Sequence, residues 1–293
     1  MLDRGEWPAT VLFSGSENLG KQTIAVWLAQ RQLCQHAGQR PCGACVDCRQ
    51  VTAGTHPNLL TFSSTEAALT MEEMQQAVQR LKWKTHAAER RWVILADVEK
   101  LSEAVGNSLL KLIEEPPVGT SIVMTTSQPD RVLPTLRSRA IEFTWHRVNH
   151  AELDQVIQKK FPALSPSLRR VIARQAHGRP GLAFSYATRP EQLTEHWSTV
   201  QILQRGLISG RWPQRREWVA SDLDETEALV RDALLSSIGI SPRTWANEIS
   251  SIQNFSTSIG TNRLAQLAQR LTNRHALLRQ HVQPSFILHD LSF

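Results

Sequence analysis

The sequence lacks any long hydrophobic run and any secretory signal. No apolar stretch approaches the ~18 to 20 residues that a membrane helix needs. Residues 1–6 (MLDRGE) show neither the basic start nor the apolar stretch of a signal peptide. We therefore expect a cytoplasmic protein without a membrane partner.

Cysteine is scarce, and its placement excludes a fold that is held together by disulfides. The chain has four cysteines in 293 residues, too few to cross-link a protein of this size. All four fall within one short segment, as Cys34, Cys42, Cys45 and Cys48. Crowding of this kind in a cytoplasmic protein indicates a metal site rather than disulfides.

Internal repeats, low-complexity tracts and an extreme composition are also missing. Apolar residues make up 41% of the chain and charged residues 20%, which excludes the disordered and fibrous classes. The length suffices for two or three domains with sizeable cores. The formal net charge of +6 suits a protein that works near nucleic acid, but many proteins without such a partner are equally basic.

Short β-rich runs alternate with helical stretches between residues 7 and 143. The alternation predicts a parallel α/β sheet whose ligands bind at the carboxyl ends of the strands. In the first helix we expect Ile24, Trp27 and Leu28 to share the apolar face. The predicted strands are residues 11–13, 58–62, 92–96, 121–126 and 141–143, and the predicted helices are 23–33, 71–81 and 102–114.

The β pattern disappears after residue 148. Two short amphipathic helices are predicted around Leu153 and Leu168, and residues 178–181 (GRPG) mark a break. From residue 190 the pattern is helical, with an apolar stripe from Leu264 to Leu278. We predict three domains, namely an α/β domain at 1–147, a small helical domain at 148–188 and a second helical domain at 189–293.

Residues 15–22 (GSENLGKQ) have the pattern of a phosphate-binding loop between a strand and a helix. In such a loop Gly15 and Gly20 let backbone amides close around phosphate oxygens, and Lys21 reaches the outer phosphates. The next position needs a hydroxyl for magnesium, but it holds Gln22, and on a helix Thr23 is rotated by ~100° from it. We expect this degenerate loop to bind ATP and Mg²⁺ weakly or not at all.

The acidic element after the third strand has a similar fault. Asp97 ends the strand, as a magnesium-orienting aspartate does, but Val98 stands where a water-activating glutamate is needed. Glu99 follows, and on a strand-like backbone it would point to the opposite side from Val98. The alternative is an α/β protein with an accidental loop. We favour a loop that once served a nucleotide.

The four cysteines predict a structural zinc site. Tetrahedral zinc takes four soft ligands without an open position, and the Cys-x2-Cys-x2-Cys spacing of Cys42, Cys45 and Cys48 supplies three, with Cys34 as the fourth. A redox dithiol is the main alternative, and it needs only two of the four. A catalytic zinc is disfavoured because four thiolates leave no site for water. We expect neither His36 nor His56 to be a ligand.

Four segments resemble the bacterial clamp-loader AAA+ subunits, and the resemblance covers nearly the whole chain. It implies an AAA+ type α/β nucleotide-binding domain with a zinc module, a helical lid and a helical collar that joins subunits. In the segment at residues 133–140 (LPTLRSRA), Ala140 stands where the family has the cysteine of a Ser-Arg-Cys element. The segments are residues 41–48 (PCGACVDC), 107–117 (NSLLKLIEEPP), 133–140 (LPTLRSRA) and 283–288 (QPSFIL).

The resemblance implies a role for Arg139. Some subunits of this family are ATPase motors, and one is a stator whose arginine enters the ATP site of the adjacent motor. There Arg139 would stabilise charge on the transferred phosphoryl group, because a guanidinium stays charged and binds oxygens as a planar fork. An intrachain ion pair of Arg139 is the structural alternative, and Arg137 is the competing arginine.

The departures from the motor pattern favour the stator. Besides Gln22 and Val98, Gly181 stands where the motors have a phosphate-sensing arginine. Thr126 or Ser127 is expected at the polar sensor position of the fourth strand, but a sensor without a base hydrolyses nothing. The resemblance therefore implies a subunit without ATPase activity of its own.

The implied partners are the gamma or tau motor subunits and the delta subunit, with the sliding clamp and primed DNA contacted through the assembled DNA polymerase III complex. An active motor ATPase of the gamma or tau type is the first alternative. A stand-alone zinc protein that binds DNA is the second. It would use the basic and aromatic residues Lys82, Trp83, Lys84, Arg90, Arg91 and Trp92.

Overall fold

The computed structural model describes residues 7–63, 72, 90–209, 220–241, 249–272, 283, 287 and 291. Three predictions fall wholly or mostly on other residues. They are the helix at 71–81, the basic and aromatic stretch at 82–84, and the terminal segment 283–288. The described chain forms two compact units, Met1–Arg147 and Val148–Phe293.

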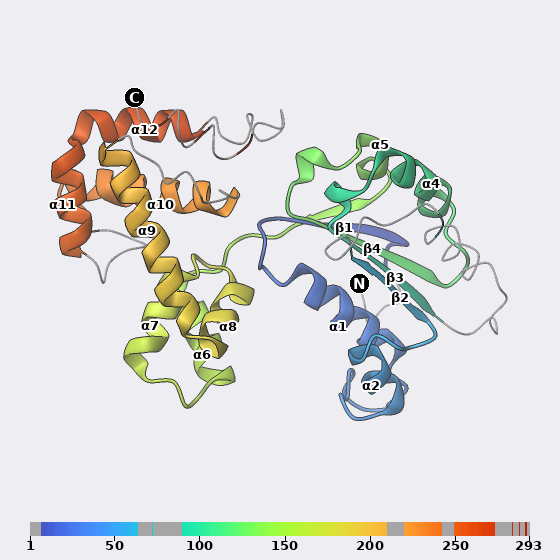
Figure 1. The fold of residues 1–293 in the computed structure, drawn as a ribbon. Helices are drawn as coiled ribbons and strands as arrows, with labels where there is room; N and C mark the ends of the chain where they lie inside the picture. Colours follow the sequence, from blue (N-terminus) through green and yellow to red (C-terminus); the bar gives the residue numbers. More distant parts are fainter. Residues whose placement is uncertain are drawn as a thin grey trace. The chain divides into compact units, whose positions relative to one another are not determined.

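The first unit is built on a parallel sheet, which confirms the predicted α/β class. Among the described residues the sheet has five strands in the order β2-β3-β4-β1-β5 (Figure 1). Every neighbouring pair is parallel, and Val11 of β1 lies opposite both Val123 of β4 and Ile141 of β5. The strands are β1 (Thr10–Ser14), β2 (Leu59–Ser63), β3 (Arg91–Ala96), β4 (Thr120–Thr126) and β5 (Ile141–Thr144).

Alternate residues of the central strands pack into two layers, because successive side chains of a strand point to opposite faces. Leu12 and Val93 pack with the apolar residues of α4 (Glu103–Glu114). Val11 and Ile94 pack with those of α1 (Lys21–Leu33). Figure 1 shows these two helices on opposite faces of the sheet. Burial on both faces explains why the middle of each of these strands is a continuous apolar run, VLF in β1, WVILA in β3 and IVM in β4.

The helices of the first unit begin and end close to the predicted positions. Ser102 caps α4 by accepting a hydrogen bond from the amide of Val105 at 3.4 Å. The expected apolar face of α1 is wrong in part. Trp27 is 41% exposed, and the helix buries Ala25, Leu28 and Ala29 instead. The remaining described elements are α2 (Val46–Thr52), η2 (Val98–Lys100), η3 (Pro129–Arg131) and α5 (Pro134–Arg137).

The second unit is helical in its described part and contains two separate apolar cores. One core joins α6, α7 and α8, and the other joins the later helices. The finer division into domains at 148–188 and 189–293 stays a prediction. The helices are α6 (His150–Lys160), α7 (Pro166–Gln175), α8 (Pro180–Thr188), α9 (Glu191–Ser209), α10 (Ala220–Ser237), α11 (Ile249–Ile259) and α12 (Thr261–Thr272).

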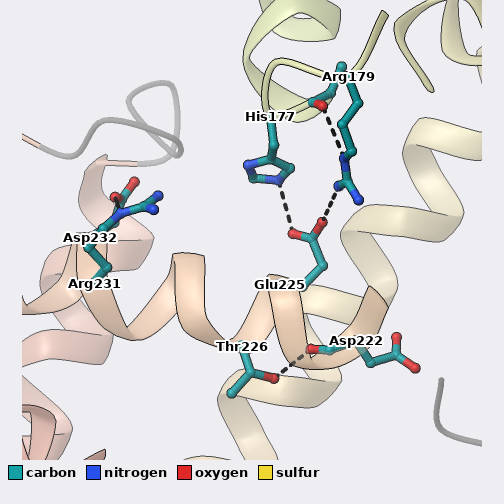
Figure 2. Close-up of polar contacts among 8 residues, drawn as sticks. His177, Arg179, Asp222, Glu225, Thr226, Arg231 and Asp232 are labelled. Carbon is teal, nitrogen blue, oxygen red and sulfur yellow. Dashed lines mark hydrogen bonds and ion pairs between the residues drawn. The ribbon is translucent and has the colours of Figure 1, made fainter. Parts of the chain in front are cut away.

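A buried ionic cluster links α10 to the turn between α7 and α8. Figure 2 shows Glu225 facing His177 and Arg179. The Glu225 carboxylate lies 3.1 Å from His177 Nε2, and it accepts a hydrogen bond from Arg179 Nη2 at 3.4 Å. All three side chains are buried, so their mutual contacts supply polar partners in a place that water does not reach.

No helix in the described ranges is long and apolar enough to cross a membrane. This finding agrees with the absence of a long hydrophobic run in the sequence.

Candidate functional site

The four cysteine sulfurs of the first unit converge at one point. All four Sγ atoms lie within 4.8 Å of one another. The Cys42–Cys48 and Cys45–Cys34 sulfur pairs are each 3.9 Å apart. Zinc–sulfur bonds of ~2.3 Å in a tetrahedron place the sulfurs about 3.8 Å apart. The cluster therefore fits a tetrahedral metal, and the donor set is consistent with a zinc module.

Local backbone geometry brings the cysteines together. Cys34 is the C-terminal cap of α1, and Cys45 is the N-terminal cap of α2. The Cys45 amide donates to the Cys42 sulfur, and the Cys48 amide donates to the Cys45 sulfur, each at 3.3 Å. Gly43 has a φ of 73°, a left-handed value that glycine adopts without strain. The tight turn between Cys42 and Cys45 depends on this residue.

The thiols of the cluster differ in acidity. Hydrogen bonds from the amides of Ala44 and Cys45 lower the pKa of the Cys42 thiol. Burial raises the pKa of the Cys48 thiol, because a thiolate loses its hydration there. A bound cation would compensate that loss and hold both sulfurs as thiolates.

Asp47 and His56 lie beside the cluster without joining it. Asp47 places one carboxylate oxygen 3.9 Å from the Cys45 sulfur and the other 3.5 Å from His56 Nε2. His56 Nδ1 accepts a hydrogen bond from the Asn58 amide at 3.0 Å. Among the described residues, the group that can hold a metal consists of cysteines alone.

The phosphate-loop pattern lies between β1 and α1, as predicted. Gly15 has a φ of 140°, and a Cβ atom added there would lie 2.4 Å from the Trp145 carbonyl oxygen. The Lys21 ammonium donates to the carbonyl oxygens of Gly15 and Ser16, each at 2.7 Å. Burial lowers the pKa of Lys21, while the negative charges of Glu99, Asp97 and Glu17 oppose that shift. The lysine is thus held by its own loop.

The acidic element differs from its predicted geometry. Asp97 has a left-handed φ of 55°, and residues 98–100 form a short 3-10 turn, so the strand-like backbone expected there is wrong. The Asp97 carboxylate pairs with Lys100 at 3.1 Å. Val98 packs in the apolar core beneath the sheet. The residue that stands in place of a catalytic glutamate is therefore a core residue.

Glu99 is a buried acid at this edge of the sheet that sequence reasoning set aside. One carboxylate oxygen accepts hydrogen bonds from the amide and the hydroxyl of Ser127, at 2.9 and 2.6 Å. The other oxygen is buried, and no hydrogen-bond partner is found for it in the described structure. The hydroxyl of Thr126, the other candidate for the sensor position, accepts a hydrogen bond from the Gln128 amide at 3.1 Å. Sequence reasoning missed Glu99 because it did not predict the turn that directly follows Asp97.

Arg139 follows α5 and is partly exposed. Its Nε donates to Glu114 Oε1 at 2.5 Å, so the intrachain ion pair considered as an alternative is present. The competing Arg137 pairs with Glu142 at 2.8 Å. A hydrogen bond from Ser14 and the interaction with Arg137 keep the pKa of Glu142 below its ordinary value, although burial opposes the shift. Arg137 is therefore tied to the edge strand β5.

The geometry defines a class of protein: an AAA+ type α/β unit with a degenerate phosphate loop and a four-cysteine module, followed by helices. A family model described as "DNA polymerase III, delta subunit" matches residues 1–149, and the chain belongs to that family. The expected membership of the clamp-loader family is thereby confirmed.

Curated relatives show the same family relationship. The chain is 27% identical to the DNA polymerase III subunit delta' of Yersinia pestis, over 88% of this chain and 80% of that protein. It is 26% identical to the delta' subunit of Bacillus subtilis, over 57% of this chain and half of the relative. It is also 26% identical to the tau subunit of Escherichia coli, over 60% of this chain and 28% of that protein.

A solved structure of a gamma subunit-related protein from Thermotoga maritima overlays with a TM-score of 0.44 and 14% identity. The overlay covers 99% of this chain and 95% of that one.

Proposed function

We propose that this chain is a delta'-type stator subunit of the replicative clamp loader. It hydrolyses no ATP itself and supplies Arg139 to the ATP site of a neighbouring gamma or tau subunit. The observation that carries the proposal is the contrast between two sites. Arg139 is partly exposed at the end of α5, whereas the chain's own phosphate loop lacks the groups that hydrolysis needs.

Several features of the chain support the absence of ATP hydrolysis at its own site. Gln22 offers no hydroxyl for magnesium, and Val98 is buried in the apolar core. In the second unit Gly181 stands where the motors have an arginine, and the nearby Arg179 is buried against Glu225. These losses are independent of one another, so one substitution would not restore a motor.

Arg139 has the chemistry that phosphoryl transfer requires from a neighbour. Its guanidinium stays charged at any physiological pH, and its fork of N–H donors matches phosphate oxygens. Charge that develops on the transferred group would be stabilised at the moment of reaction, which is worth ~10³ to 10⁵ in rate where an arginine acts in trans.

The four cysteines would hold one zinc ion in a structural role. Zinc supplies four bonds that fix the turn between α1 and α2, and four thiolates leave no position for water. The other proposed partners are the delta subunit and, through the assembled loader, the sliding clamp and primed DNA. The proposed location is the cytoplasm.

The test is Arg139→Ala in a loader reconstituted with motor and delta subunits. ATP turnover stimulated by the clamp should fall, because the site that receives Arg139 would lose ~10³-fold or more in rate. Arg137→Ala is the matched control and should leave turnover nearly unchanged, because Arg137 is held on Glu142. Unchanged turnover in the Arg139 variant would refute the arginine finger.

A second candidate is an active motor ATPase, and Glu99 is the observation that favours it. Its carboxylate is buried near Lys21, and one oxygen has no partner among the described groups. The bonds from Ser127 weigh against this role, because a general base must be able to reach water.

A further inference from the structure

Arg139 contacts a residue of a different element, at a position far from it in the sequence. Glu114 is the last residue of α4, and its carboxylate accepts from Arg139 Nε across 25 residues of chain. Both side chains are partly exposed, at 46% for Glu114 and 35% for Arg139. The pair therefore lies at the surface of the first unit, where a neighbouring subunit can reach it.

The guanidinium is only partly used by its own chain. Nε donates to Glu114, and Nη1 donates to the Thr135 carbonyl at 2.9 Å and to the Ser138 hydroxyl at 3.4 Å. Among the described residues Nη2 has no partner. Since a guanidinium carries five N–H donors, two on each Nη and one on Nε, the two on Nη2 are left for an external acceptor.

The elements that carry the pair are firmly packed. A Cβ atom added to Gly106 of α4 would lie 2.3 Å from a methyl carbon of Leu133, just before α5. Leu109 of α4 and Leu136 of α5 are fully buried in the same core. Glu114 therefore offers a fixed point for a long side chain that would otherwise sample many rotamers.

We propose that Glu114 is a positioning residue for Arg139, in that it orients the guanidinium so that Nη2 faces the ATP site of the neighbouring subunit. The inference rests on the proposed function of Arg139. An exposed ion pair contributes little to folding, so the main effect of Glu114 is on the geometry of the finger. In the described structure the adjacent Glu115 makes no hydrogen bond or ion pair with Arg139, which makes it the natural control.

The experiment compares Glu114→Ala, Glu114→Gln and Glu115→Ala in the full chain, each reconstituted with motor and delta subunits. Glu114→Ala should lower the kcat of clamp-stimulated ATP hydrolysis by roughly 3- to 10-fold with an unchanged KM, since the guanidinium is misplaced but not removed. Glu114→Gln retains the acceptor oxygen and should restore most of the activity. Glu115→Ala should match the parent chain.

A double variant separates this inference from the proposed function. With Arg139→Ala already present, Glu114→Ala should cause no further loss, because the two residues act as one unit. If Arg139→Ala alone leaves turnover unchanged, the proposed function fails. If Arg139→Ala lowers turnover and Glu114→Ala does not, or raises it, only the positioning role is overturned. A loss in Glu114→Ala that persists in the Arg139→Ala background also overturns it.

Discussion

Lys21 and Glu99 are two buried charged side chains of the first unit, and each is held by its own chain. Lys21 donates to two loop carbonyls, and Glu99 accepts from Ser127. Glu99 is also the largest of the negative influences that oppose the lowering of the Lys21 pKa.

Replacing Glu99 should therefore cost stability. Glu99→Ala removes the acceptor of two hydrogen bonds from Ser127, and it removes the carboxylate whose charge acts most strongly on Lys21. We therefore expect the free energy of unfolding to fall by about 1 to 3 kcal/mol. Glu99→Gln keeps an acceptor oxygen and should cost less. Urea unfolding followed by circular dichroism measures both. Equal stability of the alanine variant and the parent would contradict this description of the site.

At the residue scale the sequence predicted identities better than contacts. The turn of Cys42, Cys45 and Cys48 and the cap at Ser102 could be assigned because their partners lie within a few positions along the chain. The Glu114–Arg139 and Glu99–Ser127 pairs could not, because their partners are 25 and 28 residues away. Only the packing of the intervening strands brings such residues together.

At the scale of elements, the helix of the four-cysteine module is too short to hold the module together by itself. The helix α2 has seven residues, too few to be stable alone. It is tied to α1 by Gln30, whose side-chain amide donates to the Cys48 carbonyl at 2.9 Å. The cysteines of both segments converge on the same point, so a metal there would join the two helices directly.

Elemental analysis of the purified chain should find about one zinc per molecule. Cys48→Ser should lose the metal, because an alcohol is a poor zinc ligand and the site has no spare donor. Asp47→Ala is the control. The Asp47 carboxylate lies 3.9 Å from the Cys45 sulfur but supplies no ligand, so the alanine variant should keep its zinc. Absence of zinc in the parent chain would remove the metal site from the account.

Strand positions could be predicted because buried parallel strands are short apolar runs, and all five predicted strands are present. The bounds of irregular turns could not. The break expected at residues 178–181 is present between α7 and α8, but it ends at Pro180, where α8 begins, because proline suits the first turn of a helix. The turn after Asp97 depends on a left-handed backbone value that no periodicity reveals. The ionic cluster of Figure 2 likewise depends on tertiary contacts.

At the scale of the whole molecule, strand order decides which residues share an edge. The strand β1 lies between β4 and β5, although neither neighbours it along the chain. Because the strands are parallel, the carboxyl ends of β1, β3 and β4 lie at one edge, where Asp97 and Thr126 lie at the ends of β3 and β4 and Lys21 begins the helix that follows β1. The sequence predicted a parallel sheet, but its order follows from three-dimensional packing.

The role of this chain depends on whether ATP is hydrolysed at its own loop or at the site of a neighbouring subunit. If the chain is a stator, its own loop is inert, and its contribution appears only when a motor subunit provides a complete site. If the chain is a motor, its own loop suffices for hydrolysis.

The direct test is ATP hydrolysis by the purified chain, alone and then mixed with the motor and delta subunits. We predict no hydrolysis above background by the isolated chain, and turnover in the mixture that depends on Arg139. Robust hydrolysis by the isolated chain, abolished by Lys21→Ala, would contradict the account and identify the protein as a motor.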